Sequence, residues 1–312
     1  MSFILFSSVP SLPVVFKQCD TKTVDIVHAY LQNILAKSNS SLASSHIQAL
    51  NQDGISISLY YRSVKDETST YIVCFICDGT ALLSPFYHEL DKYTDTLVEH
   101  LADPESYLLR WQFNCIEYVL RVVDYFKNDL SPLLYIALSR NNIEILASNP
   151  NSQIVRDTHL FISSCSLKEL MYNTEVVFEP CTNAEENTVM IEFDNKIVNY
   201  ESNKFCSKWA SMIESEFDAY VVRQKLEDYK IAANEDLNTF RRLLHLAEAD
   251  HYAFFQGYEF IKLHDNGKIL FEMLSHESMV YSLESLENLL NILQKFRLYK
   301  DSVTLNKSSV SS

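Results

Sequence analysis

The longest regular pattern of apolar positions in the chain covers Asn234 to Leu263, within a wider apolar stretch from Phe217 to Leu274. Apolar residues recur there at steps of three, four and seven, which is typical of the stripe on one amphipathic helix. The members of the stripe are Leu237, Phe240, Leu243, Leu244, Ala247, Phe254, Tyr258 and Ile261. Asn234, which two acidic residues follow, is the predicted N-cap, and Gly267 is the predicted C-cap. Because the stripe is long and aromatic, we predict that much of the chain packs against it.

The first half of the chain mixes strand-like and helix-like patterns. Residues 55–61 alternate between apolar and polar side chains, whereas residues 71–77 are apolar on both faces, which predicts a central strand. The other elements predicted in this half are short strands within residues 1–16 and helices over residues 23–36, 85–101 and 105–126. Ser84 is the predicted cap of the second helix, since Pro85 suits a first helical turn. The order of these elements is similar to that of the small longin and roadblock modules of membrane trafficking.

We therefore predict an α+β fold, with a small N-terminal sheet flanked by helices and a mainly helical C-terminal half. Residues 1–140 are predicted to form an α/β domain, and residues 141–201 a mixed, strand-rich connector. Residues 202–298 are predicted to form a helical domain packed on the rest, followed by a disordered polar tail over residues 299–312. Just before the first predicted boundary, at residue 140, residues 133–138 are apolar and fit either a helix or a strand.

Composition narrows the possible functions. The net charge is −15 and the pI is about 5.0, and no basic stripe interrupts the acidic sequence. Binding of nucleic acid or of an anionic membrane surface is therefore disfavoured, because both need clustered Lys and Arg. The chain contains only 4 Gly, and Gly-rich phosphate cradles need several close together. We accordingly predict no nucleotide cofactor, and contact with membranes only through partner proteins.

The cysteine content indicates a reducing compartment. The chain has 7 Cys at irregular spacing, which fits reduced cytosolic thiols better than a disulfide framework. The apolar residues 1–16 lack a charged leading region and contain Pro10 and Pro13, so we interpret them as strand rather than signal peptide. No apolar run reaches the roughly 18 residues of a membrane span. The predicted localisation is cytoplasmic.

Two spacings resemble metal or redox motifs. Cys74 and Cys77 form a single CxxC, but residues three apart on a strand point to opposite faces, which favours two buried thiols over a zinc or redox pair. Glu248 and His251 have the Glu-x-x-His spacing of di-iron helix bundles, and His245 lies one turn earlier. A bundle needs two such motifs and the chain has one, so a merely polar helix face is the favoured interpretation. No residue is predicted to bind a metal or a cofactor.

Aromatic residues supply the candidate binding positions. The sequence contains no nucleophile elbow, zinc-protease motif or kinase loop, and no pair of carboxylates stands out as acid and base. Phe86 with Tyr87, and Tyr252 with Phe254 and Phe255, are two aromatic groups that fit either the core or a partner-binding groove. Aromatic residues dominate interface energetics, so these five are the candidate partner-binding residues.

Five sequence blocks, taken in order and with their spacing, resemble the Njmu-R family. The blocks are Tyr71-Ile-Val-Cys-Phe75, Glu89-Leu-Asp-Lys-Tyr93, Ser202-Asn-Lys-Phe-Cys-Ser-Lys-Trp209, Arg223-Gln-Lys-Leu-Glu-Asp-Tyr-Lys230 and Ala247-Glu-Ala-Asp-His-Tyr-Ala-Phe-Phe255. The resemblance covers residues 53–273 and is strongest from Ser202 to Leu274. It is weak between Asn141 and Asn187. No single block is specific, and their order carries the resemblance.

The resemblance implies a non-enzymatic role. The family is similar to the smallest subunit of a three-member complex with a large WD-repeat scaffold protein and a second large scaffold subunit. That complex helps to capture endosome-derived, clathrin-adaptor vesicles at the trans-Golgi network, with a golgin and its TBC-domain bridging protein, and the family is also linked to spermatogenesis. Two alternatives stay open: a small-GTPase regulator built on a longin-like module, and a helical metal-dependent enzyme centred on His245, Glu248 and His251.

Overall fold

The chain divides into two compact units, which are described separately. Unit 1 comprises Met1–Tyr125 and Glu216–Glu227, and unit 2 comprises Phe126–Ser215 and Asp228–Ser312. The computed structural model describes residues 2–8, 11–37, 44–52, 54–66, 69–79, 82–139, 142–146, 152–167, 173–175, 189–192, 197–198, 203–247, 250–264 and 266–276. Over these residues the predicted α+β class is confirmed. The predicted domain boundaries after residues 140, 201 and 298 stay predictions.

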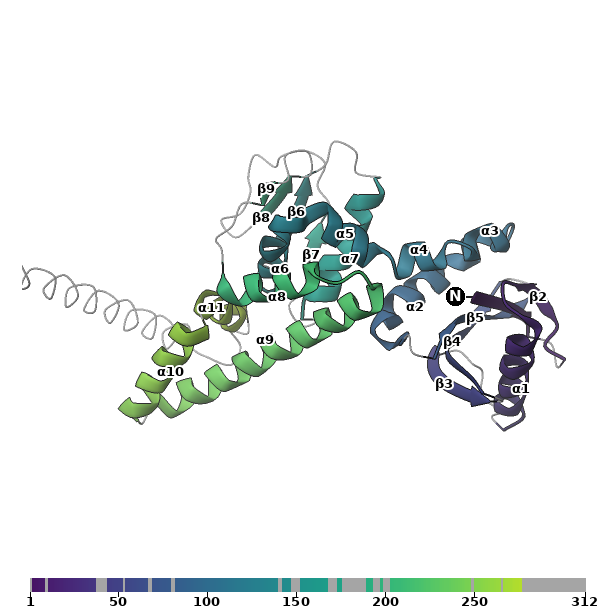
Figure 1. The fold of residues 1–312 in the computed structure, drawn as a ribbon, viewed down its shortest axis with the longest axis horizontal. Helices are drawn as coiled ribbons and strands as arrows, with labels where there is room; N and C mark the ends of the chain where they lie inside the picture. The colour runs from purple at the N-terminus through teal and green to yellow at the C-terminus, as the bar shows by residue number, and fades with distance from the viewer. Residues whose placement is uncertain are drawn as a thin grey trace, which may run out of the picture. The chain divides into compact units, whose positions relative to one another are not determined.

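Unit 1 is built on a five-stranded antiparallel sheet (Figure 1). Its strands are β1 (Ser2–Ser7), β2 (Val14–Lys17), β3 (His46–Gln52), β4 (Ile55–Lys65) and β5 (Thr70–Asp78). The order across the sheet is β2-β1-β5-β4-β3, so β5 lies in the middle and is buried over six consecutive residues. The run of apolar residues that predicted a central strand is thereby explained, because both faces of β5 are covered.

Helix α1 (Thr21–Lys37) covers one face of this sheet. Asp20 caps it, since its carboxylate accepts the backbone N–H of Thr23 at 3.0 Å and the Thr23 hydroxyl at 2.7 Å. These two hydrogen bonds lower the pKa of Asp20. The helix and the sheet share one apolar core, formed by Ile4, Phe6, Leu12, Val24, Ile26, Val27, Leu31, Ile57, Leu59, Tyr61, Ile72, Cys74 and Ile76.

Short helices cover the opposite face. They are η1 (Ser84–Phe86), α2 (Tyr87–Thr96), η2 (Leu97–His100), α3 (Pro104–Leu108), α4 (Trp111–Cys115) and α5 (Tyr118–Phe126). Phe75 of β5 stacks on Trp111 with ring centroids 4.9 Å apart.

The single helix predicted over residues 105–126 is wrong. The helical turn before Glu117 is wider than an α-helical turn, because the Glu117 N–H donates to the carbonyl of Gln112, five residues back, at 3.0 Å. The Gln112 side-chain amide also donates to the Glu117 carboxylate at 2.7 Å. Ser84 is not the cap either, because Leu83 holds that position.

Unit 2 combines helices with a four-stranded sheet in the order β7-β6-β8-β9 (Figure 1). The strands are β6 (Asn142–Leu146), β7 (Asn173–Glu175), β8 (Val189–Glu192) and β9 (Ile197–Val198). The helices that lie wholly in this unit are η3 (Lys127–Asp129), α6 (Leu130–Ser139), α7 (Gln153–Cys165), α8 (Lys204–Glu214), α10 (His251–His264) and α11 (Gly267–His276). Strand β6 pairs in parallel with β7 and β8, and β8 pairs antiparallel with β9. The ambiguous segment 133–138 is helical.

Tyr229 organises the helical core of unit 2. Its hydroxyl donates to the Leu134 carbonyl of α6 at 2.8 Å and lies 3.5 Å from the Cys206 sulfur of α8. The rings of Phe205 and Trp209, also on α8, pack on the Tyr229 ring at 5.5 and 5.9 Å. Burial raises the pKa of Tyr229 well above its ordinary value and that of Cys206 to about 12. Because the Tyr229 hydroxyl bonds to α6 and α8 and its ring packs in an aromatic cluster, this residue fixes the positions of α6, α8 and its own helix relative to one another.

The helix that contains Tyr229 is α9 (Ala219–Ala247), whose residues up to Glu227 belong to unit 1 and whose later residues belong to unit 2. The prediction that it starts at Asn234 is wrong, because Asn234 is an exposed position within it. Asp218 is next to its start and accepts the N–H of Tyr220 at 2.7 Å. Its buried stripe consists of Ala219, Val222, Arg223, Leu226, Tyr229, Ala233, Leu237 and Phe240.

The predicted single helix is also wrong at its other end, because α9 ends at Ala247 and α10 begins at His251. Asp250 interrupts the pattern by accepting the N–H of Tyr252 at 2.9 Å, as a new N-cap does. Gly267 opens α11 rather than closing the long helix. A Cβ at Gly267 would lie 2.2 Å from Ile261 Cγ2, so glycine is required there for a close approach and not for a left-handed conformation.

Candidate functional site

The exposed face of α10 is the first candidate binding surface. Tyr252 is 66% exposed, Phe255 53% and Leu263 81%, and their spacing puts them on one side of the helix. The opposite side carries Ala253 and Gly257, which are buried. A Cβ at Gly257 would lie 3.7 Å from Leu243 Cβ, so the small residues let α10 pack closely on α9. The α10 face (Tyr252, Phe255 and Leu263) therefore stays outward.

Of the five candidate partner-binding residues, Tyr252 and Phe255 are on this face. The side chain of Phe254 is outside the described part of the structure. Whether Tyr252 and Phe255 bind a partner stays a prediction, but their exposure satisfies its first requirement.

Phe86 and Tyr87 lie in unit 1, at the start of α2. Phe86 is fully buried, with its ring edge-on to Tyr220 at 5.5 Å, so it belongs to the core and is not exposed as a binding residue would be. Tyr87 is 36% exposed and packs edge-on against Tyr60 at 6.4 Å. Its hydroxyl lies 2.5 Å from the Ser45 hydroxyl, which holds the ring beside strand β3.

Beneath Phe86 lies a buried ion pair that the sequence patterns did not reveal. The Arg223 guanidinium of α9 contacts Glu89 Oε1 of α2 at 3.4 Å, and the two side chains are 4% and 6% exposed. Tyr118 donates its hydroxyl to the same oxygen at 2.6 Å, and Glu227 pairs with Arg223 at 2.7 Å. The signal in the sequence is a charged residue at a core position, because Arg223 falls on the buried stripe of α9. Buried charges need partners, so the pair fixes the first turns of α9 within unit 1.

The CxxC residues lie on opposite faces of β5, as predicted. Cys74 belongs to the core under α1, and Cys77 points the other way, with its sulfur 3.0 Å from the Tyr220 hydroxyl. Both thiols are buried. Burial raises the pKa of Cys77 to about 11 and that of Cys74 further still, which leaves both sulfurs protonated and unreactive at neutral pH.

The metal alternative rested on His245, Glu248 and His251 sharing one helix. His245 lies in the last turn of α9, whereas His251 begins α10. Glu248 is outside the described residues. Within the part of the chain that the structure describes, no three His, Cys, Asp or Glu side chains gather closely enough to hold a metal ion.

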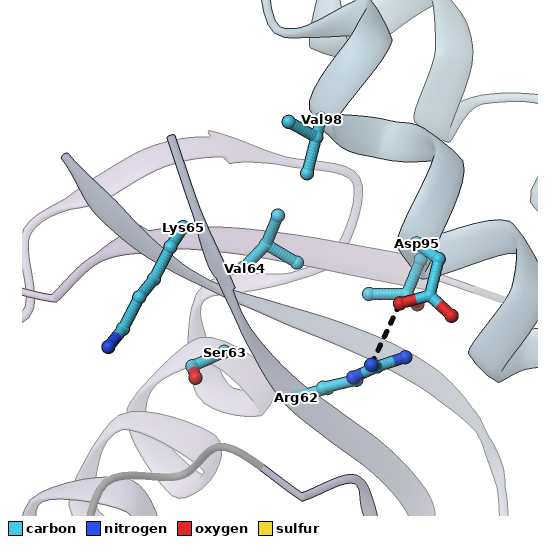
Figure 2. Close-up of a pocket in the computed structure, with 7 residues that line it drawn as sticks. Arg62, Ser63, Val64, Lys65, Asp95 and Val98 are labelled. Carbon is cyan, nitrogen blue, oxygen red and sulfur yellow. Dashed lines mark ion pairs between the residues drawn. The ribbon is translucent and has the colours of Figure 1, made fainter. Parts of the chain in front are cut away.

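Figure 2 shows a hollow in unit 1, between β4 and the end of α2 with the start of η2. Its volume is about 260 Å³, and it is lined by Arg62, Ser63, Val64, Lys65, Thr94, Asp95 and Val98. Arg62 pairs with Asp95 at 2.8 Å and lies 3.8 Å from Asp91. Two carboxylates already compensate the Arg62 guanidinium, so Arg62 itself offers little attraction to an anion.

Comparison with known proteins places the chain in a family. The model of the Njmu-R1-like protein family matches residues 41–297. The chain belongs to the Njmu-R1-like protein family. The Protein Njmu-R1 of Mus musculus is 31% identical over 229 residues, which are 68% of this chain and 58% of the mouse protein. The aligned part thus spans less than two thirds of that relative.

The Njmu-R1-like match includes β3 to β5, the Glu89–Arg223 ion pair and the α10 face. It confirms the resemblance that the five sequence blocks predicted. Among the described residues, no helix has the length and apolar character needed to cross a membrane.

Proposed function

We propose that this chain is a non-enzymatic interaction subunit of a complex that captures endosome-derived, clathrin-adaptor vesicles at the trans-Golgi network. Membership of the Njmu-R1-like family supports the setting. The observation that carries an interaction role is the α10 face, where two aromatic side chains and one leucine are more than half exposed. Exposed large apolar side chains that gather on one helix face are typical of surfaces that bind another protein.

The proposed partners are a large WD-repeat scaffold protein and a second large scaffold subunit, with a golgin and its TBC-domain bridging protein reached indirectly. The protein would be cytoplasmic and peripheral at the trans-Golgi network and on cytoplasmic vesicles. Its net charge of −15 disfavours direct attachment to an anionic membrane, so these partners would supply the membrane contact.

The test is recovery of the tagged full-length chain from cytosol, with its partners identified by mass spectrometry. We expect a WD-repeat protein and a second scaffold subunit in near-equal amounts. The variant Tyr252→Ala/Phe255→Ala should lose both. The matched control is Phe217→Ala, because Phe217 is 91% exposed but lies in unit 1. Recovery of no scaffold subunit by the unaltered chain would refute the proposal.

A second candidate function is regulation of a small GTPase. It is favoured by the architecture of unit 1, in which helices cover both faces of an antiparallel sheet and the element order is similar to that of longin modules. Nucleotide exchange and hydrolysis would be measured on a panel of Rab and Arf proteins with and without the chain. Unchanged rates throughout the panel would count against this candidate.

A further inference from the structure

The two edges of the unit 1 sheet are built very differently. The β2 edge has four residues, follows Pro13, carries Lys17 and pairs with β1 through a shifted register between Leu5 and Phe6. Short length, proline, lysine and irregular pairing are the devices by which proteins prevent a sheet edge from binding another strand. The β2 edge is therefore protected.

The β3 edge has none of these devices. Its seven residues, His46-Ile-Gln-Ala-Leu-Asn-Gln52, include no Pro, Lys, Arg, Asp or Glu, and all seven pair with β4 in one unbroken register. In the part of the chain that the structure describes, β4 is the only strand bonded to β3. Alternate backbone N–H and C=O groups of β3 consequently point away from the sheet, where a further strand can bond them.

Aromatic rings lie close to this edge on both faces of the sheet. On the face opposite α1, Ile47 pairs with Tyr60, and Tyr87 packs on Tyr60 and contacts Ser45 just before the strand. On the α1 face, the His46 ring lies 5.3 Å from Tyr61, which also contacts Tyr30 at 5.9 Å. A strand added beside β3 would thus hydrogen-bond to the β3 backbone, and its side chains on each face of the sheet would meet aromatic rings. Strand-addition sites provide both kinds of contact.

We propose that β3 is a strand-addition site, and that its occupant is an extended segment of a partner protein with an uncharged, alternating apolar core and basic flanks. The uncharged core follows from β3, which has no charged residue to pair with a charged one. The basic flanks follow from the net charge of −15, which attracts a cationic segment and repels a second copy of this chain. The site would add a second surface to the proposed interaction role and rests on that role only for its cellular setting.

The test uses the purified full chain and a displayed library of random peptides about 12 residues long, enough to span β3 with flanks. Enriched peptides should alternate in hydrophobicity and carry Lys or Arg at their ends. Selected peptides, made synthetically, should slow amide hydrogen exchange within residues 46–52, because added strand bonds protect the outward amides. Because no scaffold subunit is involved, failure here is distinct from failure of the pull-down.

The deciding variant is Ala49→Lys, which places a charge on the exposed middle of β3, with Asn51→Lys as a second variant should the first fail to fold. We expect peptide affinity to fall roughly tenfold or more in either variant. The matched control is Val15→Lys on the β2 edge, which should leave affinity unchanged. Enrichment of no peptide, or binding that survives both β3 variants, would overturn the proposal. A dimer in light scattering that Ala49→Lys dissociates would assign the edge to a second copy and overturn the choice of occupant.

Discussion

Phe86 and Tyr252 both lie at the start of a helix with a second aromatic residue one or two positions later, and the sequence alone offers no reason to expect different burial. The structure does, because Phe86 is fully buried whereas Tyr252 is 66% exposed. Phe86 meets Tyr220 and Arg223, which a helix far along the chain brings onto it. On α10 the packed side carries Ala253 and Gly257, and the rings of Tyr252 and Phe255 are exposed. Small residues, rather than aromatic ones, mark the side on which α10 packs.

This difference separates residues that stabilise the chain from residues that are available to a partner. The surroundings of Phe86 combine aromatic packing, a buried ion pair and a buried thiol, so substitutions there should lower the free energy of unfolding. The α10 face has no comparable contacts among the described residues. Substitutions on it should leave folding alone.

The largest expected effect belongs to Phe86→Ala. Removing a fully buried phenylalanine leaves a cavity that the neighbouring rings fill only in part, so we expect a loss of about 3–5 kcal/mol in the free energy of unfolding. Urea denaturation followed by circular dichroism measures this, with Tyr252→Ala as the matched exposed aromatic. A loss below about 1 kcal/mol would mean that the ring is not part of the core.

The next largest effect is expected for Arg223→Ala. It leaves the buried Glu89 carboxylate with the Tyr118 hydroxyl but no cation, and we expect a loss of about 3 kcal/mol, the lower end of the range for broken buried pairs. The double variant Glu89→Leu/Arg223→Leu removes both charges and should regain most of that loss. If the double variant were less stable than Arg223→Ala, the ion pair would not be the reason for the loss.

The local elements of unit 1 could be predicted from the sequence, but the ion pair of Glu89 with Arg223 could not. The central strand β5 and helix α1 were predicted because their patterns are local, with covered faces that can be read from neighbouring positions. The contact of Glu89 with Arg223 joins two distant parts of the chain, and no local pattern encodes it.

The predicted helix boundaries in the second half of the chain were wrong for a related reason. Asn234 and the acidic residues after it match a helix start, but the buried stripe continues upstream through Leu226 and Val222, so tertiary packing extends the helix. Of the candidate binding residues, the exposure of Tyr252 and Phe255 could be anticipated only by noting the small residues on the other side of α10.

A smaller effect, at alkaline pH, tests the thiol beside Tyr220. The folded chain raises the pKa of Cys77 from 9.0 to about 11, because burial disfavours the thiolate. Below pH 9 this leaves stability constant. Between pH 9 and 11 the unfolded chain loses the proton while the folded chain keeps it, so stability falls by up to about 1.4 kcal/mol per pH unit. In Cys77→Ala the free energy of unfolding, measured by urea denaturation at each pH, should fall less steeply between pH 9 and 11 than in the unaltered chain. Equal slopes would mean that Cys77 is not the group responsible.

The smallest effect on folding is expected on the α10 face. In Tyr252→Ala/Phe255→Ala the two rings removed are more than half exposed, so we expect the free energy of unfolding to change by no more than about 0.5 kcal/mol per substitution. Binding to the scaffold subunits should nevertheless weaken by about 2 kcal/mol or more, roughly 30-fold, if the rings are anchors of the interface. Titration of the purified scaffold into each variant measures the second quantity and urea denaturation the first. A variant that unfolds easily and binds normally would reverse the comparison with Phe86, because α10 would then belong to the core and the partner surface would have to lie elsewhere.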